Sequence, residues 1–237
     1  MSEKTIFLAG AAGVIGKCLT PRLLAAGWHV VGTTRSLVKA EELRRHGVEP
    51  VVVDVYDAEA LDRAVMQAKP RIVIHQLTDL PRGTDPAQMD AAREQNARIR
   101  IEGTRNLIAA AVRAGAQRLI AQSIAFAYTA GPTLYHEDRS LDVDAPGSAG
   151  VTARGVASLE SQVLAAPLHG IVLRYGRLYG PGTGVDAPPR HGPLHVEAAA
   201  KAACLALTRG EPGIYNIAED DGFVDTGKAR LQLGWQA

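Results

Sequence analysis

Short apolar runs alternate with segments of helical periodicity along most of the chain. Apolar runs without strict alternation are typical of parallel strands that are covered on both faces. We expect strands at 6–9, 28–33, 51–55, 71–77, 118–123, 170–174 and 213–218. Helical patterns lie between them and after the last, at about 15–26, 38–46, 57–67, 86–114, 150–165, 195–208 and 226–233. This order predicts an α/β fold with a doubly wound, mostly parallel seven-stranded sheet.

The first strand is followed at once by a glycine turn of the form G-x-x-G-x-x-G, with Gly10, Gly13 and Gly16. Gly10 permits the tight turn, Gly13 leaves no side chain between the backbone and a pyrophosphate, and Gly16 lets the helix pack close to the strand. The N–H groups that open the following helix lack intrahelical partners and suit a phosphate group. Strand, glycine turn, helix and strand predict a Rossmann-like dinucleotide site, with a purely structural turn as the alternative.

The end of the second strand lacks the acidic residue that binds the ribose hydroxyls in NAD-preferring folds. Thr34, Arg35 and Ser36 stand there instead. Arg35 could meet a 2′-phosphate, or it could be a solvated surface arginine. We therefore expect NADP as the cofactor, with NAD as the second choice. Asp54, which ends the third strand, could lie beside the adenine or cap the next helix, although Asp57 is better placed for the cap.

Composition narrows the classes of partner. The chain has 237 residues, of which 22% are charged, and a formal net charge of +1, so we expect neither nucleic acid nor a membrane as a partner. No apolar run approaches the length of a membrane span, and no signal peptide precedes the first strand. The distant cysteines Cys18 and Cys204 suggest no disulfide and favour the cytoplasm. No histidine has partners at metal-ligand spacing, so we expect no metal.

Several motifs, in this order, resemble the extended and atypical short-chain dehydrogenase/reductases, which are often described as NAD-dependent epimerases/dehydratases. The motifs are the glycine turn, the VVVDV strand, the segment EGTRNLIAAAVRAGAQRLI, a strand-end Ser123 with Tyr128 five residues later, and VLRYGRLYGPGTG at 172–184. The resemblance covers about residues 4–218. It implies cofactor contacts from Gly10, Gly13, Val14 and Ile15 at the pyrophosphate, Arg35 at the adenosine phosphate, Asp54 and Val55 at the adenine, Gln76, Leu77 and Thr78 along the nicotinamide ribose, and Tyr175 and Gly176 at the nicotinamide.

The chain departs from that family at its usual catalytic dyad, Tyr-x-x-x-Lys. In the family, the tyrosine exchanges a proton with the substrate oxygen, while the lysine lowers the pKa of the tyrosine and holds the nicotinamide ribose. If Glu160 is aligned with the helix glutamate of the family, Thr152 takes the place of the tyrosine and Val156 that of the lysine. Neither side chain can do that chemistry. No lysine occurs between positions 69 and 201, so no other register restores the pair.

Ser123 and Tyr128 are the first choice for groups that replace the dyad, as proton donor or carbonyl orienter. Ser123 lies one place before the usual catalytic serine position, which Ile124 occupies, and Tyr128 could simply form a wall of the pocket. His136 and the acidic residues after it resemble an acid/base pair, but they also read as an ordinary polar loop. His75 lies within an apolar run and is more typical of a core histidine whose hydrogen bonds are satisfied.

These observations favour an NADP(H)-dependent oxidoreductase of atypical mechanism that acts on a small carbonyl or hydroxyl substrate. A non-catalytic NAD(P)-binding sensor or regulatory protein is the alternative, and a sugar-nucleotide epimerase/dehydratase is a weaker one. We expect a single domain over 1–237, with a reduced substrate-binding portion at about 176–195 and 218–237. The resemblance also implies a possible homodimer through the helices at 86–114 and 150–165.

Overall fold

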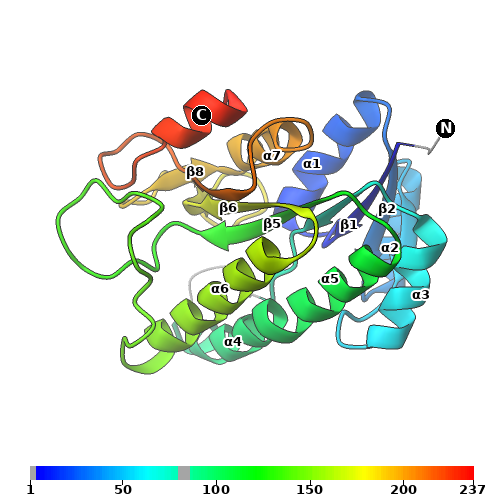
Figure 1. The fold of residues 1–237 in the computed structure, drawn as a ribbon, viewed down its shortest axis with the longest axis horizontal. Coiled ribbons are helices and arrows are strands. Elements are labelled where there is room, and N and C mark those ends of the chain that lie inside the picture. The colour runs from blue at the N-terminus through cyan, green and yellow to red at the C-terminus, as the bar shows by residue number, and fades with distance from the viewer. Residues whose placement is uncertain (1–3, 80–85) are drawn as a thin grey trace.

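The computed structural model describes residues 4–79 and 86–237 and contains a parallel seven-stranded sheet with the order β3-β2-β1-β4-β5-β6-β9 (Figure 1). The predicted doubly wound fold is therefore confirmed. The strands are β1 (Thr5–Ala9), β2 (His29–Thr34), β3 (Glu49–Val52), β4 (Ile72–His75), β5 (Arg118–Ile124), β6 (His169–Tyr175) and β9 (Gly213–Ile217). The central strands are buried on both faces, as their continuous apolar runs predict.

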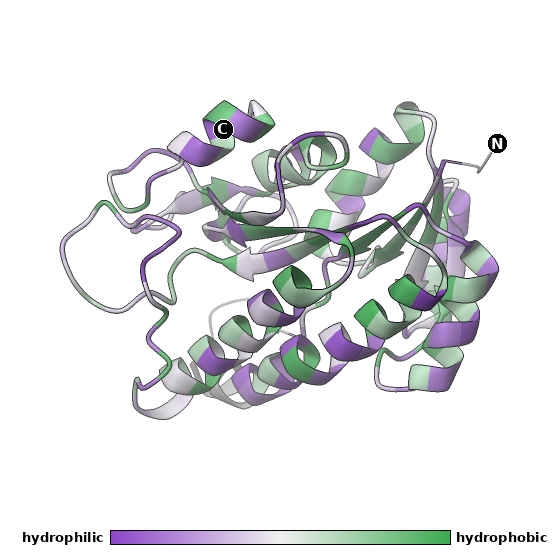
Figure 2. Ribbon diagram, in the orientation of Figure 1, coloured by the Kyte–Doolittle hydropathy of each residue, from purple (hydrophilic) through white to green (hydrophobic). Residues whose placement is uncertain are grey.

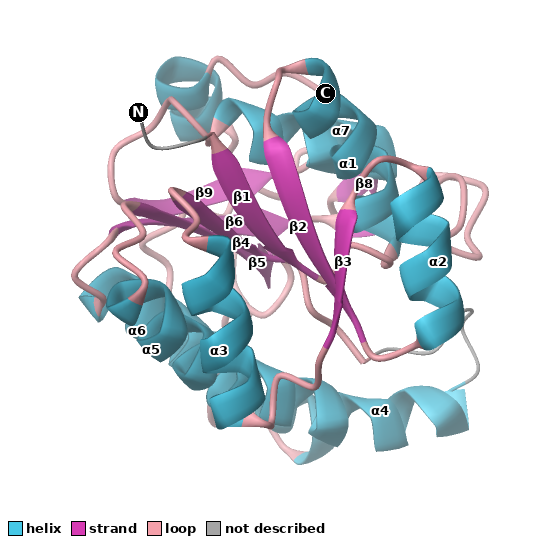
Figure 3. Cartoon of the chain, turned by 90° about the vertical axis from the view of Figure 1, so that its right-hand side faces the viewer, coloured by secondary structure: helices cyan, strands magenta, loops and turns pink. Residues whose placement is uncertain are grey.

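Helices cover both faces of the sheet, and each face has its own apolar core (Figure 3). One face carries α1 (Val14–Ala25), α2 (Leu37–Arg45) and α7 (Val196–Leu205); the other carries α3 (Ala58–Ala68), α5 (Thr104–Arg113) and α6 (Gly147–Ala165). Figure 2 shows the hydrophobic strands enclosed between helices whose outer faces are hydrophilic. Among the described residues, no helix combines the length and apolarity that crossing a bilayer requires.

The long helix expected at 86–114 is divided into three parts. Helix α4 (Pro86–Arg98) leads into a π-helical turn, η1 (Ile99–Gly103), and α5 follows directly. Gly103 has a packing reason, because an added Cβ would lie 3.1 Å from Cγ1 of Val55. Sequence periodicity did not predict the π turn, since one extra residue in a helix leaves both flanking apolar faces recognisable.

The carboxyl-terminal half contains one element that was not expected. A small two-stranded parallel sheet forms from β7 (Arg177–Tyr179) and β8 (Pro193–His195), within the segment expected to contribute to the reduced substrate-binding portion. This short pairing depends on tertiary contacts that local patterns do not reveal. The closing helix expected at 226–233 is present over 227–233, and its last five residues form the π-helical turn η2 (Ala229–Leu233).

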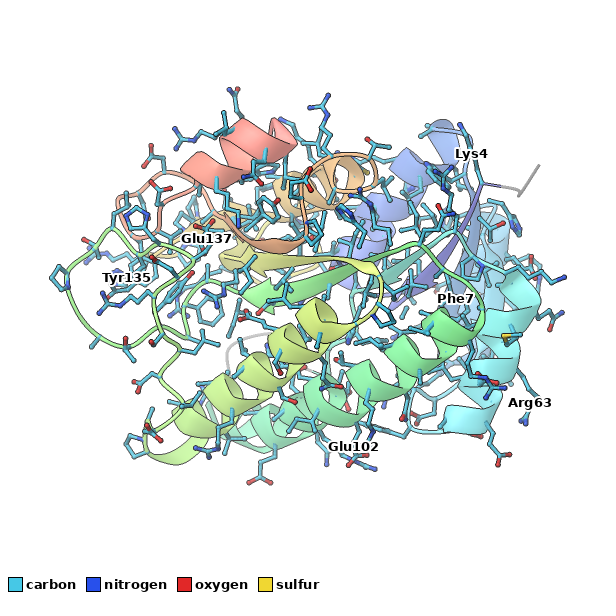
Figure 4. The ribbon with its side chains drawn as sticks, in the orientation of Figure 1. Lys4, Phe7, Arg63, Glu102, Tyr135 and Glu137 are labelled. Carbon is cyan, nitrogen blue, oxygen red and sulfur yellow. The ribbon has the colours of Figure 1, made fainter. Side chains whose placement is uncertain are left out.

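A long connection between β5 and α6 packs against the carboxyl-terminal segment. Tyr135 donates its backbone N–H to the carbonyl of Phe223 (3.0 Å) and accepts from Asp225 (2.9 Å). Glu137, on the same connection, accepts from the backbone N–H of Asn216 (2.8 Å), and Figure 4 shows both labelled side chains in this part of the fold. These contacts join segments about eighty residues apart.

Candidate functional site

A cleft of about 330 Å³ opens at the carboxyl ends of β1, β2 and β4. This is the edge of a doubly wound sheet at which ligands bind. The cleft is lined by Ala9, Gly10, Ala12, Gly13, Thr33, Thr34, Arg35, Ser36, Lys39, Val53, Asp54, Val55, Tyr56, Leu61, Gln76, Leu77, Thr78 and Ile99. It therefore brings together most residues that were predicted to bind the dinucleotide.

The glycine turn forms one end of this cleft. Gly10 has a φ of +91°, and an added Cβ would lie 2.6 Å from the carbonyl oxygen of Gln76, so a side chain is excluded on both counts. An added Cβ on Gly16 would lie 2.4 Å from the carbonyl oxygen of Gly10, so this glycine packs against the turn itself and not against the strand as predicted. Gly13 precedes Val14 as an N-cap without a side-chain hydrogen bond. The first N–H groups of α1, including that of Ile15, are thus left without a capping side chain.

The adenosine end of the cleft carries both signs of charge. Arg35 pairs with Asp79 at 2.8 Å, and this hydrogen bond raises the pKa of the guanidinium. Lys39 lines the same end, a second cation that sequence patterns did not single out. Asp54 accepts a hydrogen bond from the backbone N–H of Tyr56 (3.0 Å). Asp57, and not Asp54, caps α3, because its side chain accepts a hydrogen bond from the backbone N–H of Ala60.

The side chain of Gln76 carries a buried acceptor without a partner. Its Nε2 faces the hydroxyl of Tyr175 at 3.5 Å, and that hydroxyl donates to the carbonyl of Ala199 (3.2 Å). Because the tyrosine hydroxyl has only one proton to donate, it can only accept from Gln76, which fixes the orientation of the amide. The Oε1 atom of Gln76 is enclosed and unpartnered, although the residue lines the cleft.

Tyr175 and Gly176 lie behind the cleft and not on its surface. Tyr175 is only 1% exposed, and burial raises the pKa of its phenol. An added Cβ on Gly176 would lie 2.3 Å from the carbonyl oxygen of Gly192, so this glycine permits close packing. Neither residue lines the cleft, and Tyr175 is linked to it only through Gln76.

The cleft fits a dinucleotide on the evidence of its own atoms. The glycine turn leaves space where a side chain would stand, uncapped helix N–H groups offer donors to phosphate, and Gln76 offers an acceptor that a hydroxyl or amide of the ligand can satisfy.

Ser123 belongs to a buried ionic network. Its hydroxyl donates to Oε1 of Glu160 at 2.7 Å, and Arg174 donates to both oxygens of the same carboxylate at 2.8 and 2.7 Å. Ser123 is 1% exposed. Strand β5 therefore delivers this side chain toward α6, where it helps to satisfy a paired carboxylate.

Tyr128 is engaged in the same region. Its hydroxyl donates to Oδ1 of Asn216 at 2.5 Å, and the guanidinium of Arg174 lies 4.9 Å from its ring centre. Burial raises the pKa of the phenol, so it stays protonated at neutral pH. The predicted catalytic roles of Ser123 and Tyr128 stay predictions, and neither residue lines the cleft.

The structure accounts for the histidines that the sequence left open. His75 is 1% exposed; its Nδ1 accepts from the N–H of Leu77 (3.3 Å) and its Nε2 faces the hydroxyl of Thr104 (3.0 Å). Burial lowers its pKa to about 4, as expected for a neutral core histidine. His136 is exposed, with Nδ1 4.0 Å from a carboxylate oxygen of Asp225. Within residues 4–79 and 86–237, no group of three or more possible metal ligands is present.

The parallel sheet, the glycine turn and the cleft together define a dinucleotide-binding fold of the extended short-chain dehydrogenase type. The chain belongs to the NAD dependent epimerase/dehydratase family, which it matches over residues 6–193. It is 41% identical to a 3-diazoavenalumate denitrifying reductase of Streptomyces sp over 238 residues, which cover 91% of this chain and 76% of that protein.

Solved structures show the same fold. A UDP-glucose 4-epimerase of Thermotoga maritima with UDP-glucose has a TM-score of 0.78 at 19% identity, covering 98% of this chain and 93% of the other. A UDP-glucose 4-epimerase of Thermus thermophilus in complex with NAD has a TM-score of 0.70 at 23% identity, covering 92% and 78%.

Proposed function

We propose that this protein is an NADPH-dependent reductase that replaces the diazo group of a small aromatic compound by hydrogen and releases dinitrogen. A relative of 41% identity is named a denitrifying reductase of a diazo compound, and it aligns with most of this chain. The observation that carries the proposal is the chemistry that helix α6 lacks.

Helix α6 offers no acid where the family's dyad would stand. Thr152 is a weak acid, and Val156 is a fully buried hydrocarbon. Reduction of a carbonyl produces an alkoxide, which must receive a proton, and a positioned general acid typically contributes about 10²–10⁴-fold to such a step. Loss of both dyad residues therefore favours a substrate whose reduction needs no proton at the reacting centre.

An aryl diazonium is such a substrate. Its C–N bond breaks, and the bonding pair leaves with dinitrogen. The two electrons of a hydride form the new C–H bond, and the positive charge of the substrate is matched by that of the oxidised cofactor. Atoms, electrons and charge balance without a proton. The protein therefore has to position the reactants and exclude water, but it does not have to supply an acid.

Bound reduced nicotinamide would supply the hydride. The residues that would hold the dinucleotide are those of the cleft: Gly10 and Gly13 at the pyrophosphate and Gln76 through its unpartnered Oε1. Arg35 and Lys39 support NADP over NAD, because a 2′-phosphate adds negative charge where two cations line the cleft.

Carbonyl reduction with Tyr128 as the acid is the second candidate. The phenol has a pKa raised by burial, which keeps its proton available, and Arg174 lies beside its ring. The double variant Ser123→Ala/Tyr128→Phe separates the two reactions. Carbonyl reduction is expected to fall by about 10²–10⁴-fold, whereas denitrification is expected to change only as far as stability does.

The direct test uses 4-carboxybenzenediazonium and NADPH deuterated at C4 of the nicotinamide. We expect protein-dependent release of dinitrogen and deuterium on the arene carbon, above the rate of a control without protein. Reduction of carbonyl compounds with no acceleration of this reaction would refute the proposal. Cofactor binding without turnover of either class would instead favour the non-catalytic sensor.

We also propose a homodimer in the cytoplasm. Apolar side chains on the outer side of η1, α5 and α6 are partly exposed, with Ile101 at 40%, Val112 at 38% and Leu164 at 45%. Cys18 and Cys204 are free thiols, which agrees with a reducing compartment. Light scattering at micromolar concentration is expected to give the mass of a dimer, and a monomer at all concentrations would reject this part.

A further inference from the structure

Arg100 is a buried arginine on the π-helical turn η1, and it faces helix α6. The residue is 6% exposed. An added Cβ on Gly155 would lie 3.5 Å from Cδ of Arg100 and 3.0 Å from Cβ of Ala97, so the arginine stem passes over a helix position without a side chain. Gly155 directly precedes Val156, which the alignment through Glu160 places at the family's lysine. A cation therefore lies beside the place of the lost dyad, but it comes from the facing element.

No described residue neutralises this cation. Among the side chains that the structure describes, those of 4–79 and 92–237, none forms a hydrogen bond or ion pair with the Arg100 guanidinium, whereas the buried Arg174 holds both oxygens of Glu160. Glu160 lies near enough to interact with Arg100 at longer range, but its charge is matched by Arg174. Glu102, on the same turn, points outward and pairs with Arg98 (Figure 4).

The charge on Arg100 persists at neutral pH. Burial lowers its pKa only to about 10, so the guanidinium is ionised. His75, the titratable neighbour from β4, has a pKa lowered to about 4 by burial and brings no charge. A buried ion without a partner is strongly unfavourable, and proteins otherwise keep such groups paired.

The guanidinium of Arg100 is nevertheless not completely enclosed. Among the described residues, only two unpartnered side-chain atoms are completely enclosed, the Oη of Tyr56 and the Oε1 of Gln76. The nitrogens of Arg100 are not among them, so they keep some accessible surface. A π-helical turn is also a feature that occurs frequently at functional sites. If Arg100 only filled space between the helices, its charge would serve no purpose and an apolar side chain would suffice.

We propose that Arg100 binds an anionic group of the substrate, a carboxylate, beside helix α6. A carboxylate supplies the absent counter-charge and can accept two parallel hydrogen bonds from a guanidinium. The phosphates of the dinucleotide are expected at the glycine turn and at Arg35, in the cleft that Arg100 does not line. This rests on the proposed function and deepens it, since it makes the substrate an aryl diazonium that also carries a carboxylate.

The test measures binding without turnover. Protein saturated with NADP⁺ is titrated calorimetrically with 4-hydroxycinnamate, which has a carboxylate and no diazo group, and with its methyl ester. We expect the acid to bind more tightly than the ester. Arg100→Gln should weaken binding of the acid by about 10- to 100-fold and leave the ester unchanged, whereas Arg100→Lys should retain part of the preference. Arg105→Gln, which removes an exposed arginine one turn away, is the matched control and should change neither.

Three results would overturn the proposal. The first is equal binding of acid and ester by the wild type, including the absence of binding by both. The second is unchanged binding of the acid by Arg100→Gln. The third concerns stability: Arg100→Met should leave the melting temperature of the ligand-free protein unchanged or higher, whereas Arg174→Met should lower it. An equal fall in both variants would show that the Arg100 guanidinium is already satisfied within the protein. Selective acid binding without diazonium turnover would reject the denitrifying activity alone.

Discussion

Replacing Arg35 by alanine should remove most of the preference for NADPH over NADH. Arg35 lies at the carboxyl end of β2, lines the cleft and is half exposed. Its present partner is Asp79, at 2.8 Å. A 2′-phosphate must therefore compete with this carboxylate for the guanidinium or share it.

The magnitude follows from these two interactions. Hydrogen bonds from a guanidinium to phosphate contribute about 1.5–3 kcal/mol net. The pair with Asp79 has side chains that are 55% and 31% exposed, so its loss costs no more than about 1 kcal/mol. If the full cost of about 1 kcal/mol is subtracted, about 0.5–2 kcal/mol remains, which corresponds to roughly 2- to 30-fold in Kd. Arg35→Ala should weaken NADPH binding by that factor and leave NADH binding nearly unchanged.

Calorimetric titration of both cofactors into matched variants is the assay. Asp79→Asn removes the competing carboxylate and should tighten NADPH binding by up to about 5-fold without affecting NADH. Arg44→Ala, which removes an exposed cation of α2 paired with Glu41, controls for the general loss of positive charge. Added salt should reduce the preference of the wild type. Equal losses for NADPH and NADH in Arg35→Ala, or an equal loss of NADPH binding in Arg44→Ala, would refute 2′-phosphate recognition by Arg35.

Three further outcomes are expected. Gly13→Ala should fold, because an added Cβ meets only one atom of the protein, at 3.2 Å, but it should bind either cofactor weakly. Gly16→Ala should instead lower the melting temperature, since its Cβ would lie 2.4 Å from a backbone oxygen. As pH falls, His75 takes up a proton near its ordinary pKa of 6.5 in the unfolded state, but only near its lowered pKa of about 4 in the folded state. The free energy of unfolding should therefore fall by up to about 3 kcal/mol between these two pH values, as measured by urea titration. His75→Gln should flatten that pH dependence. Val156→Lys places a second cation at a fully buried position next to Gly155 and should destabilise the fold by about 3 kcal/mol or more. The destabilisation should be smaller when Arg100 is also changed to glutamine, and additive effects of the two substitutions would contradict the placement of Arg100.

The parts of the structure that follow local rules were predictable from the sequence. Continuous apolar runs identified the seven strands, and the glycine spacing identified the turn at the head of α1. The absence of an acidic residue before Arg35 was also a local signal, and the structure places Arg35 in the cleft as expected. The predicted boundaries of the strands were less accurate. The third strand was expected at 51–55, but β3 ends at Val52, which leaves Asp54 in the turn that follows.

The rest depended on which side chains find partners, which no local pattern contains. Ser123 lies near the end of β5 at the ligand-binding edge, yet its hydroxyl is directed to Glu160 of α6. The alternation of side chains along β5 sets this direction, and Arg174, the partner of Ser123 on the neighbouring β6, binds the same carboxylate. Arg100 gave no signal, and Gln76 was named only through the family resemblance, because an amide or a guanidinium becomes informative only when its surroundings are seen to leave it unsatisfied.

The positions of the buried charges also connect the missing dyad to the proposed chemistry. In a carbonyl reductase of this family, a lysine cation on α6 serves to lower the pKa of the neighbouring tyrosine, so the two residues are useful only together. On the alignment through Glu160, Val156 stands in place of that lysine and Thr152 in place of that tyrosine, so we expect neither the cation nor the acid on α6. In our proposal, Arg100 supplies a positive charge from η1 beside Gly155, the neighbour of Val156. A cation that activates no acid is suited to hold a substrate anion, and a substrate held in this way needs only a hydride if its leaving group departs without a proton.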